Sequence, residues 1–564
     1  MTFATAQFRS LLPAATFVMA GEFLMGLADM VVTGHVLGES ALAALNLLQP
    51  LFNVVSFLAL LIGTGASVLF ATAIGGFQER RAHELFTQGL WSALGLGTLL
   101  LLALALGLAP FLGLFGASAD VTALAVTYGR WFLPCAVFEP LAVFLANMCY
   151  TDGDGRVCYV AYGVQLVCNF LLSIPLTRAF GIAGCAQASV LGHLLACVVM
   201  CAHFLRKGNN LRLVRHFSAA DTARICWCSA GDAALKLCYA ALFLLLNVYV
   251  VRRFGSGTLP VLAVVVTVMG VAEVFDGVGV SVQPLAGVYI GERNDVRTRS
   301  VMNTALQVAL GEGLAVTLVL LLAPRLVTGL VGLDDPALVP LAESAVRYAA
   351  LGLVATAVMM LFNSYYTFIE REGLATLLTV FTMLVAPAAL VPVLGAFWGI
   401  DGVWLALGLA PTLALGLFAL GLCWKYGRAR FPYLLDPARR ANIRVFDLVL
   451  DPVSVCAASA GVAAQLKACG RPAAQVTRAA LLVEETLMVV CDRNAGRRIR
   501  AEVTVDLNDA LSLVMRDDGA IFDLTDADAR ISSLRSYLVS NLMTAIPNRR
   551  NLTTTGFNRN VFKL

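Results

Sequence analysis

Two acidic residues lie inside an apolar segment of this chain that is long enough to cross a membrane. The segment covers residues 11–36 and holds Asp29, with Glu22 two helical turns earlier. About twenty apolar residues suffice to span a bilayer, and an ionised acid at that depth is costly unless it faces a cavity or a partner. A carboxyl group there can alternate between a charged form that binds a cation and a neutral form that does not. Asp29 and Glu22 are therefore candidate ion-binding residues, the alternative being acids neutralised by a buried amide or phenol.

A second pair of acids lies in the apolar segment 259–289. Glu273 and Asp276 are three residues apart, which places them on one face of a helix. Two acids one turn apart repel each other inside a membrane unless they are protonated or bridged by a cation. We therefore expect Glu273 and Asp276 to line a cavity and to favour cationic substrates.

The composition indicates an all-α polytopic membrane protein. Hydrophobic residues make up 59% of the chain and charged residues only 13%, whereas about a quarter of a soluble domain is charged. Hydropathy and window length predict twelve transmembrane helices. They fall at residues 11–36, 48–73, 90–114, 131–150, 157–176, 182–204, 230–251, 259–289, 301–323, 348–368, 374–397 and 402–422. The first segment is too long for the apolar part of a signal peptide and carries an acid. We therefore expect it to stay in the protein as a transmembrane helix.

Charge and cysteine usage restrict the other function classes. Lysine and arginine gather in the loops after the even-numbered helices, which predicts a plasma-membrane protein with both termini in the cytoplasm. The net charge of +4 follows from this bias, so a nucleic-acid partner is not expected. The 14 cysteines include no CxxC pair and no Cys/His cluster, so they predict neither a metal site nor a cofactor.

The membrane part repeats at an offset of about two hundred residues. In the first copy, residues 38–45 are followed by a G-x-G at 63–65 and by a charged turn at 74–80. In the second copy, residues 255–262 are followed by another G-x-G and another charged turn in the same order. Two six-helix lobes, 1–215 and 216–430, would enclose a central cavity, which is the arrangement that alternating access requires.

The order of these short motifs resembles the MATE (multidrug and toxic compound extrusion) transporters over residues 10–425. The matching residues are Pro13, 26–29, 34–38, 41–44, 49–50, 75–76, 151–156, Asn169 and 181–184. The resemblance implies a secondary antiporter, not an enzyme, that exports small organic and often cationic compounds in exchange for H⁺ or Na⁺. It also implies a monomer in the lipid bilayer.

The resemblance assigns roles to particular residues. Asp29 falls on the acid of the first helix that is implicated in cation coupling, and it is the candidate Na⁺ ligand. Asn169 falls on an Asn of the fifth helix in the same site, and Ser173 stands where many relatives have an acid. A seventh-helix acid found in another branch is absent here, where Lys236 lies. The other polar residues that we expect to line the cavity, or to join helices by hydrogen bonds, are Asn53, Asn247, Asn363, Tyr365 and Tyr366.

The composition changes after Lys425, and residues 431–564 predict a cytoplasmic α+β domain with a helix at 473–490 and strands at 499–508 and 510–516. Segments 481–486, 516–523 and 556–558 resemble the histidine-kinase-type ATPase fold, most nearly the anti-sigma-factor kinases. The resemblance implies that Asp517 accepts a hydrogen bond from the adenine amine and that Gly519 lets the backbone approach the base. It also implies that Glu485 is the acid of the helix motif. Val489 replaces the asparagine that binds Mg²⁺. We therefore expect a degenerate regulatory module, with nucleotide or a regulatory protein as its partner, or an ordinary turn at 517–519.

Two other functions fit a chain of this kind. A flippase for lipid-linked precursors belongs to the related superfamily, but it would require a basic cavity, and the acids above favour cations. A membrane sensor that controls a kinase in the tail is disfavoured by Val489.

Overall fold

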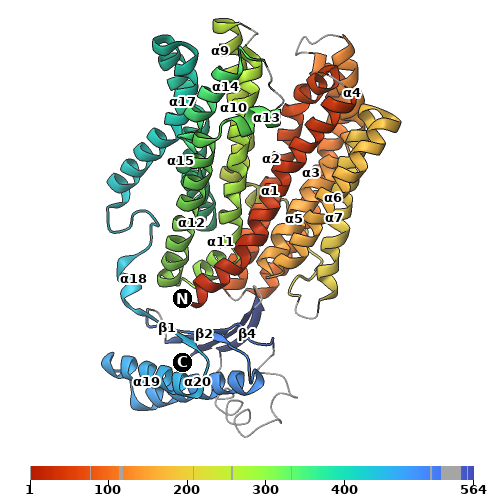
Figure 1. Ribbon diagram of the computed structural model, residues 1–564. Coiled ribbons are helices and arrows are strands. Elements are labelled where there is room, and N and C mark those ends of the chain that lie inside the picture. The colour runs from red at the N-terminus through yellow and green to blue at the C-terminus, as the bar shows by residue number, and fades with distance from the viewer. Residues whose placement is uncertain are drawn as a thin grey trace.

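The computed structural model describes residues 2–564 except 38, 77, 114–118, 207–208, 256–257, 332, 334, 509–510, 522–547 and 555–556. Two helical bundles stand side by side, and a small domain lies across one end of both (Figure 1). The N-terminal bundle consists of α1 (Phe3–Leu37), α2 (Glu39–Gly75), α3 (Glu79–Gly113), α4 (Ala119–Phe132), α5 (Cys135–Thr151), α6 (Gly155–Phe180) and α7 (Ile182–Met200). A short 3₁₀ turn, Cys201–Leu205, and α8 (Ala219–Cys228) connect it to the second bundle.

The C-terminal bundle is more often broken. Its elements are α9 (Ala230–Phe254), α10 (Leu259–Val271), the 3₁₀ turn η3 (Ala272–Phe275), α11 (Asp276–Gly291), α12 (Asp295–Leu322), α13 (Arg325–Val331), α14 (Val339–Ala350), α15 (Leu353–Phe368), α16 (Glu372–Val380), η4 (Phe381–Val385) and α17 (Ala386–Tyr426). Within α17, Trp398 and Gly399 leave the helical conformation, and Gly399 has φ +62°. Glycine adopts this left-handed conformation at no steric cost, so the chain can reverse between two helices there.

In the described part of the chain, eight helices are long and apolar enough to cross a membrane, or up to ten if each of two bent pairs is one span. The bent pairs are α4 with α5, at 49°, and α14 with α15, at 43°. The run Glu372–Tyr426 counts once among the eight, although it is 55 residues long. These findings agree with the prediction of a polytopic helical membrane protein.

The two bundles are in close contact at the end next to the tail. A Cβ atom built on Gly291, at the end of α11, would lie 2.8 Å from the Cα atom of Gly75 at the end of α2. One turn earlier, a Cβ atom on Gly287 would lie 2.6 Å from Cβ of Ala71. Only glycine allows two backbones to pack this closely. The tail-proximal ends of the two bundles are therefore closed against each other.

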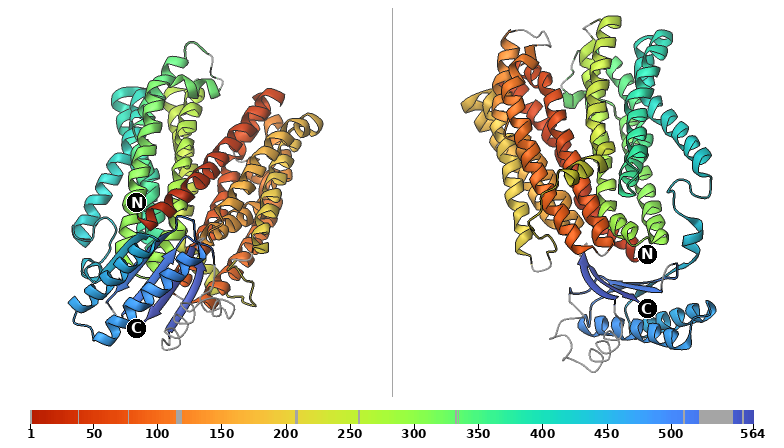
Figure 2. Two further views of the ribbon diagram at one scale, coloured as in Figure 1. Left: turned by 60° about the horizontal axis from the view of Figure 1, so that its bottom comes forward. Right: turned by 180° about the vertical axis from the view of Figure 1, so that it is seen from behind.

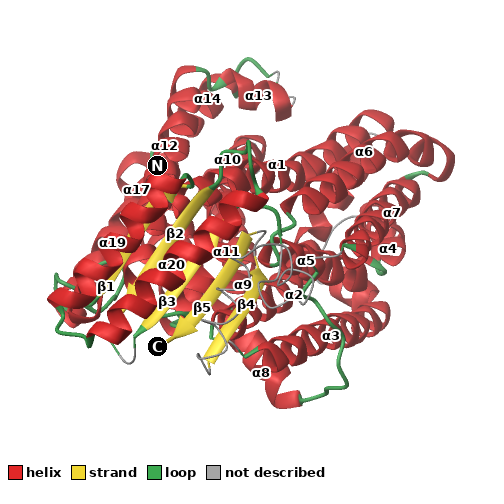
Figure 3. Cartoon of the chain, turned by 90° about the horizontal axis from the view of Figure 1, so that it is seen from below, coloured by secondary structure: helices red, strands yellow, loops and turns green. Residues whose placement is uncertain are grey.

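The tail is an α+β domain, as the sequence predicts. After α18 (Pro437–Ala441), strands β1 (Ile443–Val449), β2 (Arg500–Asp506), β3 (Ser512–Asp517), β4 (Asn548–Thr554) and β5 (Phe557–Lys563) form one antiparallel sheet in the order β1-β2-β3-β5-β4. Helices α19 (Pro452–Ala468) and α20 (Ala473–Arg493) cover one face of this sheet (Figure 3). Its other face meets the ends of the two bundles, as Figure 2 shows from two further directions.

The two faces of the sheet differ in chemistry because side chains alternate along each strand. The face under α19 and α20 is apolar, with Val503 and Val505 on β2, Leu513 and Met515 on β3, and Phe562 on β5. The face toward the bundles carries charged residues that are nevertheless buried, among them Glu502, Arg516 and Arg559. Burial of charge on this side shows that the bundles, not solvent, cover it.

Candidate functional site

The structure places Asp29 among three helices of the N-terminal bundle. Its Oδ2 atom accepts a hydrogen bond of 2.9 Å from the Ser189 hydroxyl of α7. The Asn169 amide of α6 in turn donates to the same Ser189 oxygen over 3.1 Å. Ser189 therefore joins the two residues that the sequence motifs identify. Asn169 and Ser189 are both buried.

The Asp29 carboxylate retains acceptor capacity. Its Oδ1 atom is buried and has no hydrogen-bond partner in the described part of the chain, and the same holds for Oδ1 of Asn169. Ser173, one turn after Asn169, is buried as well, and its hydroxyl has no hydrogen-bond partner among the described residues. Buried oxygen atoms without a donor are suited to a proton or a hard cation such as Na⁺. Glu22 belongs to α1, but its side chain lies outside the described residues.

The acid pair of the C-terminal bundle lies at a break in the helix rather than within one continuous helix. Glu273 belongs to the 3₁₀ turn η3, and Asp276 begins α11. A 3₁₀ turn in mid-span often marks a functional hinge. The Lys236 ammonium of α9 forms an ion pair with Glu273, with Nζ 2.5 Å from Oε1. The cluster of Lys236, Glu273 and Asp276 therefore carries one net negative charge when all three are ionised.

The break packs against the other bundle. A Cβ atom on Gly277 would lie 2.8 Å from the Cα atom of Thr16 in α1, and one on Gly270 would lie 3.2 Å from the Phe23 ring. The helix that carries Asp29 thus runs along the segment that carries Glu273 and Asp276.

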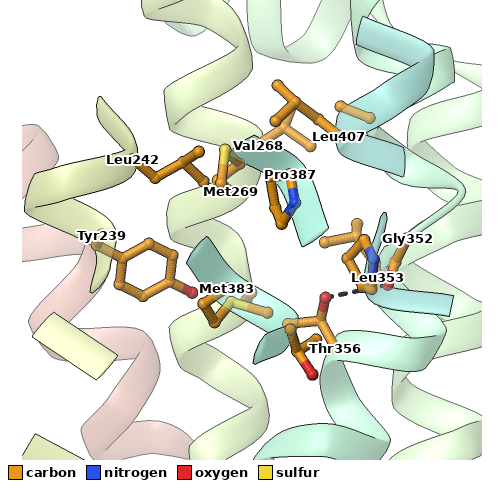
Figure 4. Close-up of a pocket in the computed structure, with 14 residues that line it drawn as sticks. Tyr239, Leu242, Val268, Met269, Gly352, Leu353, Thr356, Met383, Pro387 and Leu407 are labelled. Atoms are coloured by element: carbon orange, nitrogen blue, oxygen red, sulfur yellow. Dashed lines mark hydrogen bonds between the residues drawn. The ribbon is translucent and has the colours of Figure 1, made fainter. Parts of the chain in front are cut away.

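A small cavity lies inside the C-terminal bundle beside this break (Figure 4). Its volume is about 30 Å³, and its lining includes Tyr239, Met269, Ala272, Met383 and Pro387. A space of this size holds only one or a few water molecules, so an organic substrate enters only if the surrounding helices move. Methionine side chains adapt their shape easily, which suits them to such a lining.

Several polar residues that were predicted to line a cavity form hydrogen bonds with neighbouring segments of the chain. Asn363 accepts a hydrogen bond of 2.9 Å from Thr379, so it joins α15 to α16. Tyr365 and Tyr366 donate to the backbone oxygens of Tyr433 and Pro432, over 2.7 and 3.1 Å, and thereby hold the linker to the tail. Whether these three residues also line a cavity stays a prediction. The side chain of Asn247 lies outside the described residues.

Sequence reasoning missed other intramembrane groups. Ser189 gave no signal, because a lone serine in an apolar helix is common. Glu139 of α5 and Glu312 of α12 could have been found as acids in apolar segments. Glu139 accepts a hydrogen bond of 2.6 Å from Ser56 of α2, whereas Oε2 of Glu312 is buried without a hydrogen-bond partner among the described residues.

The motif 151–156 forms a structural elbow at the tail-proximal end of the N-terminal bundle. The ring nitrogens of His203 lie 2.8 Å from Asp152 and 2.9 Å from Asp154, and Asn210 donates to Asp152 through its backbone and its side chain. These contacts fix the turn between α5 and α6. In the part of the chain that is described, no group of three His, Cys, Asp or Glu residues is arranged to hold a metal.

In the tail, Asp517 and Gly519 lie together at the end of β3. The Asp517 Oδ1 atom accepts hydrogen bonds from the Gly519 amide at 3.1 Å and from Asn558 of β5 at 2.8 Å. Burial raises the pKa of Asp517 to about 6, although these hydrogen bonds lower it. Glu485 lies on α20, and Val489, one turn later, packs into the apolar core of the tail.

Two helical bundles with acidic side chains inside their apolar helices are typical of a membrane transporter. A family model described as MatE matches residues 14–174 and again residues 233–393, together more than half of the chain. The chain therefore belongs to the MATE family, and the internal repeat predicted from the sequence is confirmed.

The chain is also similar to individual proteins, and the solved structures among them show a common fold. The chain is 25% identical over 204 residues to the probable multidrug resistance protein YoeA of Bacillus subtilis (strain 168), a match covering 35% of this chain and 44% of that protein. The chain thus spans less than half the length of this relative. Among solved structures, an outward-facing multidrug resistance MATE family transporter aligns with a TM-score of 0.70 and 21% identity over 76% of this chain and 96% of that one. A MOP superfamily transporter from Pyrococcus furiosus aligns with a TM-score of 0.68 and 21% identity over 77% and 97%.

Proposed function

We propose that this protein is a secondary antiporter that exports small organic compounds, mainly cations, in exchange for H⁺ or Na⁺. Membership of the MATE family and the similarity to a multidrug resistance protein support drug export. The observation that carries the coupling step is the Asp29 carboxylate, which has one oxygen bound to Ser189 and the other buried without a hydrogen-bond partner in the described chain. Such a carboxyl group can bind a coupling ion and release it when its surroundings change.

The proposed topology has twelve spans in two six-helix lobes, 1–215 and 216–430, with the tail 431–564 in the cytoplasm. Two facts support a count above the ten spans found by length and composition. The break at Gly399 divides a run of 55 residues into two lengths that each reach across a bilayer. Helix α1, which is not counted among the ten, is 35 residues long with Pro13 inside it, and this length exceeds what one bilayer crossing needs. The arginine-rich loops on the tail side support a cytoplasmic tail in a plasma-membrane protein.

Substrate export proceeds in this proposal without an enzymatic step and without a cofactor other than the coupling ion. The tail is a degenerate module related to the histidine-kinase-type ATPases. Val489 supports this part of the proposal, because its side chain lies in the core of the tail and offers no oxygen to Mg²⁺. The flippase and sensor alternatives are not favoured, since the family assignment points to efflux.

The direct test is transport by the purified full-length protein in proteoliposomes. Export of a fluorescent organic cation is measured with a proton gradient, a sodium gradient or neither. Export that requires one of the two gradients, and dissipates it, supports the proposal and identifies the ion. Export that is equally fast without either gradient would rule out antiport.

A further inference from the structure

Where the tail sheet meets the bundles, three arginines and three acids form a network of ion pairs, and all of these side chains are buried except Asp447, which is 29% exposed. Arg297 of α12 pairs with Glu502 of β2 at 2.7 Å and with Asp447 of β1 at 2.5 Å. Arg516 of β3 pairs with the same Glu502 at 2.7 Å and also with Glu292, the residue that follows α11. Arg559 of β5 pairs with Glu292 at 3.2 Å. The formal charges of the six residues cancel.

This network joins the tail to the C-terminal bundle through two residues, Glu292 and Arg297. Both side chains are almost completely buried, at 4% and 5% exposure. The ring of Tyr289, two residues before the end of α11, lies under the Arg516 guanidinium at 4.7 Å. A buried ion pair costs desolvation energy, so such a network persists only where every charge has a partner in place. Here that condition is met only while tail and bundle are in contact.

The same tail residues also hold the N-terminal bundle. Arg559 donates a hydrogen bond of 3.1 Å to the backbone oxygen of Ile74 at the end of α2. Asp447 accepts one of 2.8 Å from the backbone amide of Phe3 at the start of α1. The Phe3 ring meets the Phe557 ring of β5 edge to face, with 5.4 Å between centroids. Arg559 and Asp447 thus each contact both bundles.

The contacts surround the point at which the bundles close. Ile74 and Glu292 flank the glycines Gly75 and Gly291, whose backbones are in contact. A transporter of the alternating-access type opens on this side only if its bundles separate there. Separation would pull Ile74 away from Glu292, and Arg559 could no longer reach both.

We propose that the tail is a clamp that holds the two bundles closed at their tail-proximal ends, so that release of the tail controls the rate of export. The clamp consists of Asp447, Glu502, Phe557, Arg516 and Arg559 on the tail. It grips Phe3 and Ile74 on one bundle and Glu292 and Arg297 on the other. The inference rests on the proposed function, because only a protein that alternates between two open sides has a use for it.

The test follows the opening of the tail-proximal ends in the full-length protein. Spectroscopic probes are placed on Arg80 of α3, whose side chain is 93% exposed, and on the exposed Arg371 between α15 and α16. The chain has 14 native cysteines, so the probes are attached through non-canonical amino acids. Distances between the probes are measured without substrate or ion gradient, and turnover is measured separately in proteoliposomes.

Two variants weaken the clamp from opposite sides. Glu292→Gln removes the charge that Arg516 and Arg559 share on the C-terminal bundle, and Phe3→Ala removes the ring on the N-terminal bundle. In Glu292→Gln, the ratio of open to closed protein is expected to rise about tenfold, as for the loss of one charge-assisted hydrogen bond. Phe3→Ala is also expected to raise the ratio of open to closed protein. Both variants should transport substrate faster than the unaltered protein.

Tyr433→Phe is the matched control. It removes a hydrogen bond of 2.7 Å between the linker and Asn303 of α12, a contact with the C-terminal bundle alone. This variant should keep the distances and the turnover of the unaltered protein. If Glu292→Gln does not purify as folded protein, Arg559→Lys replaces it, since lysine keeps the charge balance but lacks the fork that reaches both Ile74 and Glu292.

The outcomes separate the clamp from the proposed function. Distances that lengthen in the two clamp variants support the clamp even if no organic cation is exported, in which case the proposed function alone fails. Distances and turnover that match the unaltered protein in both clamp variants overturn the clamp, even if export is established.

Discussion

Arg516 and Asp517 are neighbours on strand β3, and their side chains lie on opposite faces of the tail sheet. Arg516 reaches Glu292 at the end of α11, whereas Asp517 binds Asn558 and the Gly519 amide on the other face. The register of β3 with β5 pairs Arg516 with Arg559 and Asp517 with Asn558. The residues that resemble a nucleotide site are therefore one position away, on the same two strands, from the residues that grip the bundles. A change in the position of Asp517 or Asn558 would reach the clamp through the backbone.

The first prediction concerns the pH dependence of the tail. Burial raises the pKa of Asp517 from 3.8 to about 6. Because the folded protein holds this proton more tightly than the unfolded chain does, protonation stabilises the tail. The contribution is complete below 3.8 and is lost as the pH rises through 6, and it amounts to about 3 kcal/mol. Hydrogen exchange of the β3 and β5 amides, corrected for intrinsic rates, should therefore be slower below pH 6 than above it.

The variant Asp517→Asn should remove this pH dependence, since an amide does not titrate. Asp518→Asn is the matched control, because the neighbouring Asp518 accepts a hydrogen bond from the Arg500 amide without sharing the buried site. Equal pH dependence in both variants and in the unaltered protein would assign the effect to another group.

The second prediction concerns nucleotides. We expect isolated residues 440–564 to bind adenine nucleotides weakly or not at all and to show no Mg²⁺-dependent turnover. Asn558 and the Gly519 amide already donate to Oδ1 of Asp517. Val489 offers no ligand to Mg²⁺, which prefers oxygen atoms in octahedral geometry. Calorimetry with ATP and Mg²⁺ checks this. Micromolar, metal-dependent binding with release of phosphate would contradict it and revive the sensor alternative.

Much of the membrane part could be predicted from the sequence, because hydropathy identifies spans and the repeat relates the two bundles. The motifs also point to Asp29 and Asn169, which the structure joins through Ser189. The Ser189 hydroxyl that joins them could not be predicted, since no pattern distinguishes it from a packing serine. The helix break at Glu273 was missed as well, because four residues of 3₁₀ turn leave the apolar pattern unchanged.

The docking of the tail could not be predicted for a different reason. The alternation in β2 and β3 predicts which residues share a face, but charged residues on one face normally indicate solvent. Arg516 and Glu502 are completely buried, because the bundle ends supply the opposite charges. A sequence shows that a sheet has a second face and does not show what covers it.

The third prediction concerns coupling. Asp29→Asn should abolish cation-driven export while insertion and folding stay intact, because an amide cannot exchange a proton or bind Na⁺ as a charged ligand. Ser189→Ala should reduce export less, since it removes one hydrogen bond, typically worth about 1 kcal/mol, and leaves the carboxylate in place. Asp120→Asn, which removes an exposed acid of α4, is the control. Normal export by the Asp29 variant at normal expression would refute the assignment.

The fourth prediction concerns substrate charge. The double variant Glu273→Gln with Asp276→Asn should lower the preference for cationic substrates, because it leaves Lys236 as the only charge of the cluster. Lys236→Met should act in the opposite direction, since it leaves two acids without their cation. Competition between cationic and neutral substrates of similar size measures both. If neither variant changes the substrate profile or the ion dependence, the cluster is structural.

The last prediction concerns the contact between the bundles themselves. Gly291→Ala should prevent full closure of the tail-proximal ends, because its Cβ atom would lie 2.8 Å from both Cα of Gly75 and the Thr72 oxygen, which are backbone atoms. Gly287→Ala should act in the same direction through Cβ of Ala71, at 2.6 Å, without altering the residue next to Glu292. Distances between probes on Arg80 and Arg371 should lengthen in both.

The control is Gly311→Ala in α12, where a Cβ atom would meet nothing within 4 Å. Alanine stabilises a helix relative to glycine by roughly 1 kcal/mol, so this variant separates the effect of helix propensity from that of the contact. If Gly291→Ala and Gly287→Ala show the distances of Gly311→Ala, the glycines do not set the closure of the bundles. If only Gly291→Ala opens them, the effect runs through Glu292 and the clamp rather than through the packing of α2 on α11.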